Sequence, residues 1–179
     1  MDASDVIGTL ADGGIDYMVT GSTAMNYYTP PRNTGDIDLL LDLAPPEYER
    51  RLRPLFAGHP EVYVADLIPA EPDQMGQLTT GSLRFDLIIR PSPWTTSRFA
   101  RRDRLSDPAL GDVWVTSVED LILAKIESHH ALPTGLQWTD ALRLRDHVEG
   151  LDWAYVELWA LRLSIDDDIR ALRLAPPLP

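Results

Sequence analysis

The first half of the chain alternates short helical and strand-like segments. Apolar residues at helical spacing predict a helix over residues 4–13, and the apolar run 15–19 that follows the glycine pair predicts a strand. A glycine-containing turn then leads into a second helix over 23–28, which the proline pair 30–31 must terminate. The segment 36–42 lies between a loop and a second proline pair, so we expect it to form a buried strand.

The pattern continues with a helix and two strands and then becomes helical. A helix with one charged face is expected over 46–57, and the runs 62–68 and 83–89 carry the β-branched and aromatic residues typical of strands. We expect these two strands to pair antiparallel, since turn-rich residues separate them. From Ser117, which is spaced as a helix cap, apolar residues recur with helical periodicity. The proline-rich tail 175–179 cannot continue a helix and is expected to fray.

This order of elements predicts an α+β fold of two layers, in which helices flank a mixed β-sheet and a helical subdomain follows it. A chain of 179 residues with 44% hydrophobic content can bury one ordinary core, or a compact core with a small appended subdomain. The composition changes near residues 91–115. We therefore expect a core domain over 1–115 and a C-terminal helical subdomain over 116–179.

The composition limits the location, the metal ligands and the binding partners that we expect for this protein. No run approaches the ~20 apolar residues of a membrane span, and the first residues lack the features of a signal peptide, so we expect a cytoplasmic protein without membrane association. Without cysteine, any bound metal must use oxygen or imidazole ligands, which favours hard divalent cations. The net charge of −12 disfavours broad nucleic-acid binding, because that mode relies on Lys and Arg. The run Arg98, Arg101, Arg102 and Arg104 is either a local basic patch or a solvated loop.

Three aspartates in the strand-like runs are the main candidates for chemistry. Side chains alternate faces along a strand, so Asp36 and Asp38 point the same way, about 7 Å apart. Asp86 lies in the otherwise apolar run 85–89, where an isolated acid is costly unless it is partnered. Unpaired carboxylates repel one another, and a divalent cation such as Mg²⁺ resolves this repulsion. The alternative is that each is an ordinary solvent-facing acid.

The pair Gly21-Ser22, upstream of the acids, suggests a place for phosphate. Gly21 allows the backbone to approach a ligand closely, Ser22 adds a hydroxyl donor, and the following helix begins with unpaired N–H groups. Phosphate on one side and metal-binding acids on the other would form a site for a nucleoside triphosphate. By itself, the pair is also a routine turn between a strand and a helix.

As a set, these residues resemble the signature of polymerase-beta-type nucleotidyltransferases. The signature consists of Gly21-Ser22, then Asp36-Ile37-Asp38 after 13 intervening residues, and Asp86 on a later strand. More narrowly, the chain is similar to bacterial AbiEii-like nucleotidyltransferases in the segments TGSTAMNYYTPPRNTGDIDLLL, RFDLII, VTSVEDLILAKI and LRLRDHVEGLDWAYVELWALRL. Some members of that group are toxins of toxin–antitoxin or phage-defence systems. The resemblance implies a nucleotidyltransferase fold.

The resemblance also implies roles for the site residues. Asp36 and Asp38 would bind Mg²⁺ or Mn²⁺. Asp86 would join them and help to activate the acceptor hydroxyl. Ser22, beside Gly21, would contact the triphosphate. The gap between Ser22 and Asp36 is longer than in minimal nucleotidyltransferases, although it suits the AbiEii-like group.

Two basic residues are further candidates for nucleotide binding. Lys125 matches a family lysine that can reach the active site and pair with phosphate; otherwise it is a helix lysine whose stem covers apolar surface. Arg32, in the loop before the acidic strand, could hold phosphate through its planar fork; otherwise it is a surface arginine. Asp146 matches a family position where it either joins the site or braces the helical subdomain. His129 and His130 are adjacent on a predicted helix, so they do not face one ligand.

Together these features predict a metal-dependent nucleotidyltransferase, which transfers a nucleoside monophosphate from an NTP to an acceptor hydroxyl and releases pyrophosphate. The acceptor stays open between an RNA end such as that of tRNA, a protein hydroxyl and a small molecule. The resemblance adds a toxin role with a cognate antitoxin as partner. The alternative is a non-catalytic module of the same fold, which binds nucleotide or a partner without turnover.

Overall fold

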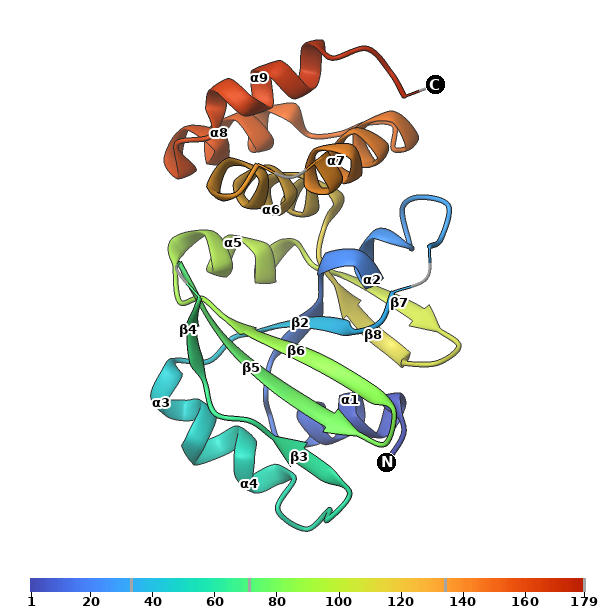
Figure 1. The fold of residues 1–179 in the computed structure, drawn as a ribbon, viewed down its shortest axis with the longest axis vertical. Coiled ribbons are helices and arrows are strands. Elements are labelled where there is room, and N and C mark those ends of the chain that lie inside the picture. The colour runs from blue at the N-terminus through green and yellow to red at the C-terminus, as the bar shows by residue number, and fades with distance from the viewer. Residues whose placement is uncertain (33, 71, 134, 179) are drawn as a thin grey trace. The chain divides into compact units, whose positions relative to one another are not determined.

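The computed structural model describes residues 1–32, 34–70, 72–133 and 135–178. Most elements lie where the hydrophobic pattern predicts them (Figure 1). In chain order they are α1 (Ala3–Asp12), β1 (Tyr17–Val19), α2 (Gly21–Met25), β2 (Ile37–Leu41), α3 (Pro45–Glu47), the π-helical η1 (Tyr48–Leu52), α4 (Arg53–Leu55), β3 (Val62–Val64), β4 (Ile68–Ala70), β5 (Asp73–Thr80), β6 (Leu83–Ile89), α5 (Pro93–Arg101), β7 (Asp103–Asp107), β8 (Gly111–Val115), α6 (Val118–Ala131), α7 (Gly135–His147), α8 (Trp153–Leu163) and α9 (Asp166–Leu174).

Contacts divide the chain into two compact units. The first consists of Met1–Thr23 and Asn33–Thr116, and the second of Ala24–Arg32 and Ser117–Pro179. A single cut after residue 115 does not describe this division, because the early segment 24–32 groups with the C-terminal helices. Within the second unit, Arg143 Nη2 donates a hydrogen bond to the carbonyl of Pro30 at 3.0 Å. The Asn26 amide bonds both the N–H and the carbonyl of Arg32 at 3.0 Å. These bonds fix the segment.

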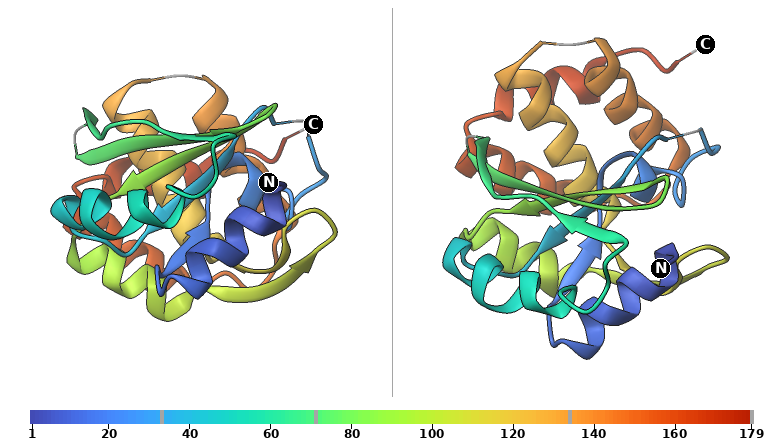
Figure 2. Two further views of the ribbon diagram at one scale, coloured as in Figure 1. Left: turned by 90° about the horizontal axis from the view of Figure 1, so that it is seen from below. Right: turned by 60° about the horizontal axis from the view of Figure 1, so that its bottom comes forward.

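The first unit is built on a mixed sheet. Among the described residues, the strands lie in the order β3-β5-β6-β2-β1-β8-β7, and β4 pairs with β5. The pairs β2–β6 and β1–β8 are parallel, whereas the others are antiparallel. Helix α1 and the α3–α4 segment lie on the same side of this sheet (Figures 1 and 2). The predicted class, a mixed sheet flanked by helices, is confirmed.

Strand β5 corrects one prediction. The runs 62–68 and 83–89 do not pair with each other, because β5 lies between β3 and β6 and pairs with both. The sequence of β5 is largely polar and contains Gly76, both of which weaken a strand pattern. Gly76 has a packing reason: a Cβ there would lie 2.4 Å from the hydroxyl of Tyr48 in η1. That buried hydroxyl donates to the carbonyl of Ala65 at 2.7 Å.

The buried face of the sheet decides where the predicted acids lie. Leu39 and Leu41 on β2, and Phe85, Leu87 and Ile89 on β6, are all buried. They are register neighbours of one another, so they form a continuous apolar face. Because side chains alternate along each strand, the residues between them project from the opposite face.

The second unit is helical, as predicted. Ser117 caps α6, since its hydroxyl accepts the N–H of Asp120 at 3.2 Å. Helix α6 packs against α7, α8 and α9. Within the described part of the chain, no helix has both the length and the apolar character to cross a membrane.

The C-terminal tail is held, so the prediction that it frays is wrong for residues 175–178; the final proline lies outside the described residues. Arg145 Nη1 donates to the carbonyl of Ala175 at 2.9 Å, and the Asp146 carboxylate accepts the N–H of Leu178 at 2.9 Å. Burial would raise the pKa of Asp146, but hydrogen bonds from Leu178 and Arg145 outweigh it and hold that pKa below its usual value. Asp146 therefore braces the helical unit.

We expect Asp146→Asn to lower the free energy of unfolding at neutral pH by about 1 kcal/mol. The folded-state pKa of Asp146 lies below the unfolded-state value, so this stabilisation is present above about pH 4 and is lost as the pH falls through the folded-state pKa. Urea unfolding at neutral pH and at about pH 3 measures the difference. The exposed Asp167→Asn serves as control; equal losses for both variants, or a loss independent of pH, would contradict the assignment.

Candidate functional site

The parallel pairing of β2 with β6 brings the predicted acids together. Asp38 on β2 and Asp86 on β6 are register partners, so they project from the same face of strands about 4.8 Å apart. Asp36 immediately precedes β2. Its Oδ2 lies 3.8 Å from Nη2 of Arg84, the β6 residue two positions before Asp86. The three aspartates therefore belong to one region of the first unit, which we call the acid cluster.

Two neighbours already hold Asp86. Arg84 forms a bidentate pair with it, Nε to Oδ1 at 3.0 Å and Nη2 to Oδ2 at 3.1 Å. Gln77, the register partner of Asp86 on β5, donates from Nε2 to Oδ1 at 3.1 Å. Hydrogen bonding and the charge of Asp86 raise the pKa of Arg84, and the charges of Asp36 and Asp38 add to the effect.

Arg84 and Gln77 were missed in the sequence. Arg84 had a usable signal, because a residue two positions before Asp86 on a strand shares its face. Gln77 had none, since its position follows from a strand that the hydrophobic pattern did not predict.

Gly21 lies against the acid cluster. Its φ is +59°, and a Cβ there would lie 1.9 Å from Oδ2 of Asp38, so only glycine fits. The adjoining backbone is tied to the acidic segment, since the N–H of Thr20 donates to the Asp38 carbonyl at 2.9 Å and the Thr23 hydroxyl to the Asp36 carbonyl at 3.2 Å. In this structure Gly21 therefore approaches Asp38 closely, and the predicted approach to a ligand stays a prediction.

Ser22 follows in α2 and is partly exposed. That helix has five residues, too few to build a substantial dipole at its N-terminus. The predicted phosphate contact of Ser22 therefore depends on its hydroxyl rather than on the helix terminus.

The side chains of the acid cluster are of the type that binds a divalent cation, but in this structure they are not arranged around a common metal position. Carboxylates are the ligands that Mg²⁺ prefers, and their shared face concentrates negative charge. Within residues 1–32, 34–70, 72–133 and 135–178, however, no group of three or more acidic or imidazole side chains is arranged to hold a metal ion. The two oxygens of Asp86 face Arg84 and Gln77 instead. Metal binding therefore requires Asp86 to exchange at least one of these partners.

The two basic residues predicted to bind phosphate converge on one carboxylate in the second unit. Oδ2 of Asp140 accepts from Lys125 Nζ at 2.9 Å and from Arg32 Nη2 at 2.8 Å. Asp140 and Lys125 are buried, with side chains 1% and 8% exposed, whereas that of Arg32 is 29% exposed. Asp140 was missed, although an acid directly before the apolar run Ala141-Leu142 in a predicted helix signals a partnered, buried charge.

The adjacent histidines have separate structural contacts. His130 Nδ1 lies 2.6 Å from Oδ2 of Asp168. The ring of His129 contacts that of Trp138 in a tilted arrangement, with centroids 5.3 Å apart and an interplanar angle of 45°. The two rings therefore contact different residues.

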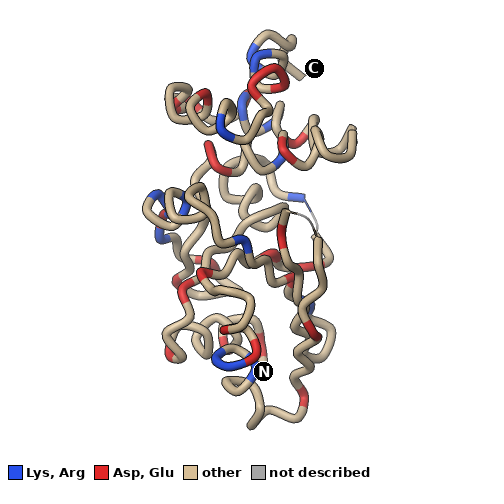
Figure 3. Tube along the Cα trace, turned by 90° about the vertical axis from the view of Figure 1, so that its left-hand side faces the viewer, with Lys and Arg blue, Asp and Glu red and all other residues tan. Residues whose placement is uncertain are grey.

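The arginine run 98–104 forms part of α5 and β7 rather than a solvated loop. Arg98 is buried and donates to the Thr20 hydroxyl at 3.1 Å. The guanidinium groups of Arg102 and Arg104 lie over the Trp114 ring, 4.6 and 5.7 Å from its centroid. These contacts give the run a packing role. Figure 3 shows that both basic and acidic residues occur in each unit.

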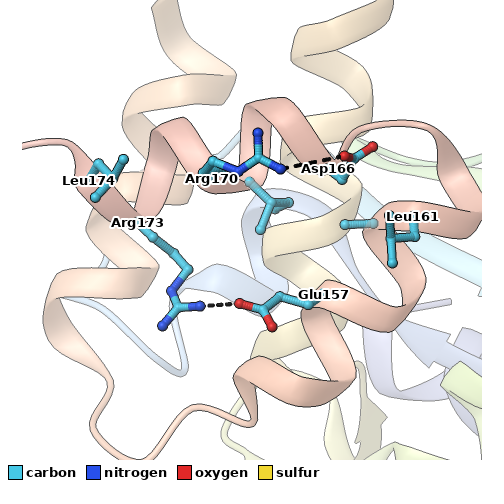
Figure 4. A pocket seen from close by; sticks show the side chains of 8 residues that line it. Glu157, Leu161, Asp166, Arg170, Arg173 and Leu174 are labelled. Atoms are coloured by element: carbon cyan, nitrogen blue, oxygen red, sulfur yellow. Dashed lines mark hydrogen bonds and ion pairs between the residues drawn. The ribbon is translucent and has the colours of Figure 1, made fainter.

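A groove of about 600 Å³ lies between α8 and α9 in the second unit (Figure 4). Leu161 and Ile169 contribute apolar lining. Arg173 pairs there with Glu157 and Arg170 with Asp166. None of the predicted site residues lines this groove.

The sequence is similar to a known protein family. Residues 9–148 match the family model described as nucleotidyl transferase AbiEii toxin, type IV TA system. A comparison with curated protein sequences finds no match.

Two solved structures illustrate the likeness in fold. An antigenic nucleotidyltransferase-like protein from Paracoccidioides brasiliensis is 15% identical with a TM-score of 0.53, over 98% of this chain and 92% of that one. ANT(2'')-Ia, in complex with adenylyl-2''-tobramycin, is 14% identical with a TM-score of 0.59, over 89% of this chain and 92% of that one. At these identities the likeness is one of fold. It confirms the nucleotidyltransferase fold that the motifs predicted.

We expect Gly21→Ala to destabilise the protein by about 1–3 kcal/mol, because it strains a positive φ and drives a methyl group into Asp38. Urea unfolding measures the loss. Gly35→Ala is the matched control, since a Cβ at Gly35 meets nothing within 4 Å. A Gly21→Ala variant as stable as the Gly35→Ala variant would show that the close approach to Asp38 does not exist.

We expect Asp140→Asn to cost about 3 kcal/mol of unfolding free energy, because Lys125 and Arg32 lose the charge that compensates them. The control is Asp166→Asn, whose carboxylate is 40% exposed and 3.9 Å from Arg170; it should change stability by less than about 0.5 kcal/mol. Denaturant titration of both variants separates the two cases. Similar small losses would mean that Asp140 is not the organising charge of this network.

Proposed function

Since the chain belongs to the AbiEii nucleotidyltransferase family, we propose that it transfers a nucleoside monophosphate from an NTP to an acceptor hydroxyl by means of a divalent cation, Mg²⁺ or Mn²⁺, held by Asp36, Asp38 and Asp86. It is a nucleotidyltransferase by family and fold. The register of β2 with β6, which sets Asp38 opposite Asp86, is the observation that carries the proposal.

The acid cluster supports metal binding through its charge. Like charges on one face of adjacent strands raise the energy of the folded protein unless a cation lies among them. Asp38 lies on β2, Asp36 immediately before it, and Asp86 on β6, so their oxygens can converge from two sides. A bound divalent cation neutralises the triphosphate and stabilises the leaving pyrophosphate.

The remaining roles in the proposed reaction are assigned to residues of the first unit. Ser22 donates its hydroxyl to a phosphate oxygen, and Gly21 keeps the backbone close to Asp38. Asp86 accepts the proton of the acceptor hydroxyl. The oxygen of that hydroxyl attacks the α-phosphorus in line, the bond from this phosphorus to the β-phosphate oxygen breaks, and pyrophosphate leaves.

In the second unit, Arg32 and Lys125 are proposed to bind nucleotide phosphate. Asp140 positions both cationic groups. Arg32 suits the role better, because its side chain is 29% exposed and ends in a planar fork, whereas the Lys125 side chain is buried.

The acceptor is proposed by class only: an RNA end such as that of tRNA, a protein hydroxyl, or a small molecule. The complex of ANT(2'')-Ia with adenylyl-2''-tobramycin supports a small-molecule hydroxyl. The family description supports a toxin role with a cognate antitoxin. The net charge of −12 disfavours a large RNA footprint but leaves room for a small contact at an RNA end.

A non-catalytic, nucleotide-binding module is the second candidate. The bidentate hold of Arg84 on Asp86 favours it, because a guanidinium paired with both oxygens of a carboxylate repels a metal ion that approaches the same oxygens. This candidate predicts nucleotide binding without turnover.

The test is incubation with each α-labelled nucleoside triphosphate, Mg²⁺ or Mn²⁺, and total RNA or cell extract. We expect wild type to label an acceptor and Asp36→Asn/Asp38→Asn to lose at least about 100-fold of this activity, since the metal site contributes several kcal/mol to the transition state. The control variant Asp12→Asn/Asp42→Asn removes the same charge outside the acid cluster and should label normally. Metal-dependent nucleotide binding with no labelling by wild type would favour the non-catalytic module.

A further inference from the structure

Arg84 occupies the place in the acid cluster where a cation would act. One of its nitrogens, Nη2, lies 3.1 Å from Oδ2 of Asp86 and 3.8 Å from Oδ2 of Asp36. Its Nε takes the other oxygen of Asp86 at 3.0 Å. The guanidinium therefore lies between the carboxylate of Asp86 on β6 and that of Asp36, which immediately precedes β2.

A divalent cation and this guanidinium compete for the same oxygens. Ligation brings a carboxylate oxygen to about 2.0–2.6 Å from the metal, and two cations cannot share an oxygen pair at such distances without strong repulsion. Gln77 is neutral and bonds one oxygen only, so it adds no such repulsion. Arg84 is thus the group that metal binding must displace.

Arg84 has the freedom to leave. Its side chain is 49% exposed, whereas that of Asp86 is 15% exposed. An ion pair whose arginine is so open to water is weak enough to break. A triphosphate arriving with the metal offers the fork new acceptors, because guanidinium binds phosphate as it binds carboxylate.

We propose that Arg84 is a built-in counter-cation that competes with the divalent metal for Asp86 and moves to the phosphates of the bound triphosphate. This inference rests on the proposed function. Arg84 is then a positioning residue for the metal, and it couples the binding of the two ligands. Metal alone has to compete with Arg84 for Asp86, whereas metal that binds together with triphosphate does not. Such coupling would keep the metal site from filling before the nucleotide arrives.

The experiment measures the affinity of the purified, intact protein for two ligands, each in the absence of the other. Mn²⁺ alone is titrated by electron paramagnetic resonance, and inorganic triphosphate alone by calorimetry without metal. We expect Arg84→Gln to bind Mn²⁺ about 3- to 10-fold more tightly than wild type and triphosphate about 3- to 10-fold more weakly. Neither readout depends on transferase activity.

Two variants separate this mechanism from a change of net charge. Arg104→Gln removes the same charge from another exposed arginine–aspartate pair, in which Arg104 lies 3.7 Å from Asp112, and should shift neither affinity by more than about 2-fold. Arg84→Lys keeps the charge but loses the bidentate fork, so its Mn²⁺ affinity should fall between those of wild type and Arg84→Gln. Thermal unfolding confirms that each variant is folded.

The outcomes distinguish this inference from the proposed function. Mn²⁺ binding that requires Asp36 and Asp38 but is unchanged or weakened in Arg84→Gln overturns the competition and leaves the metal site intact. Equal shifts in Arg84→Gln and Arg104→Gln also overturn it, because net charge then explains them. Absence of Mn²⁺ binding in wild type and every variant overturns the proposed function, and this inference with it.

Discussion

Repulsion among three carboxylates on one face of the sheet is the constraint on which the site depends. The parallel register of β2 with β6 sets Asp38 beside Asp86, and Asp36 lies at the edge of the same face. A fold that buries Leu39 and Phe85 on one side of these strands necessarily presents the acids on the other. The apolar core therefore holds the charges together, and a cation has to compensate them.

The immediate surroundings of the cluster follow from this constraint. Gly21 has no side chain, which leaves room for the Asp38 carboxylate, and its left-handed conformation turns the chain away at once. Arg84 supplies positive charge from the same strand as Asp86, and Gln77 adds a neutral donor from β5. The cluster is therefore stable without metal. Catalysis, as proposed, requires exchanging one compensating cation for another.

The second unit also contains a group of charged side chains, but their arrangement differs from that of the acid cluster. Its central charge, Asp140, is buried and neutralised by Lys125 and Arg32 together. Arg32 comes from the early segment 24–32 and Asp140 from α7, so this ion pair links residues far apart in the sequence. The family match covers both partners but ends at residue 148, before α8 and α9. The matched range thus includes the charged network and leaves out α8 and α9.

Sequence alone predicted the acids better than their partners. Alternation along a strand placed Asp36 and Asp38 on one face, and a lone acid among apolar residues marked Asp86. It could not show that β5 lies beside β6, because the polar sequence of β5 around Gly76 has no strand periodicity. Nor could local periodicity show that Lys125 and Arg32 meet at Asp140, since that contact depends on how α6, α7 and the segment 24–32 pack.

The most direct test is a crystal structure with Mn²⁺ and a non-hydrolysable NTP analogue, in which anomalous scattering locates the metal. We expect Mn²⁺ within about 2.0–2.6 Å of carboxylate oxygens from Asp36, Asp38 and Asp86. Manganese bound elsewhere, or nucleotide bound with no metal at these aspartates, would contradict it.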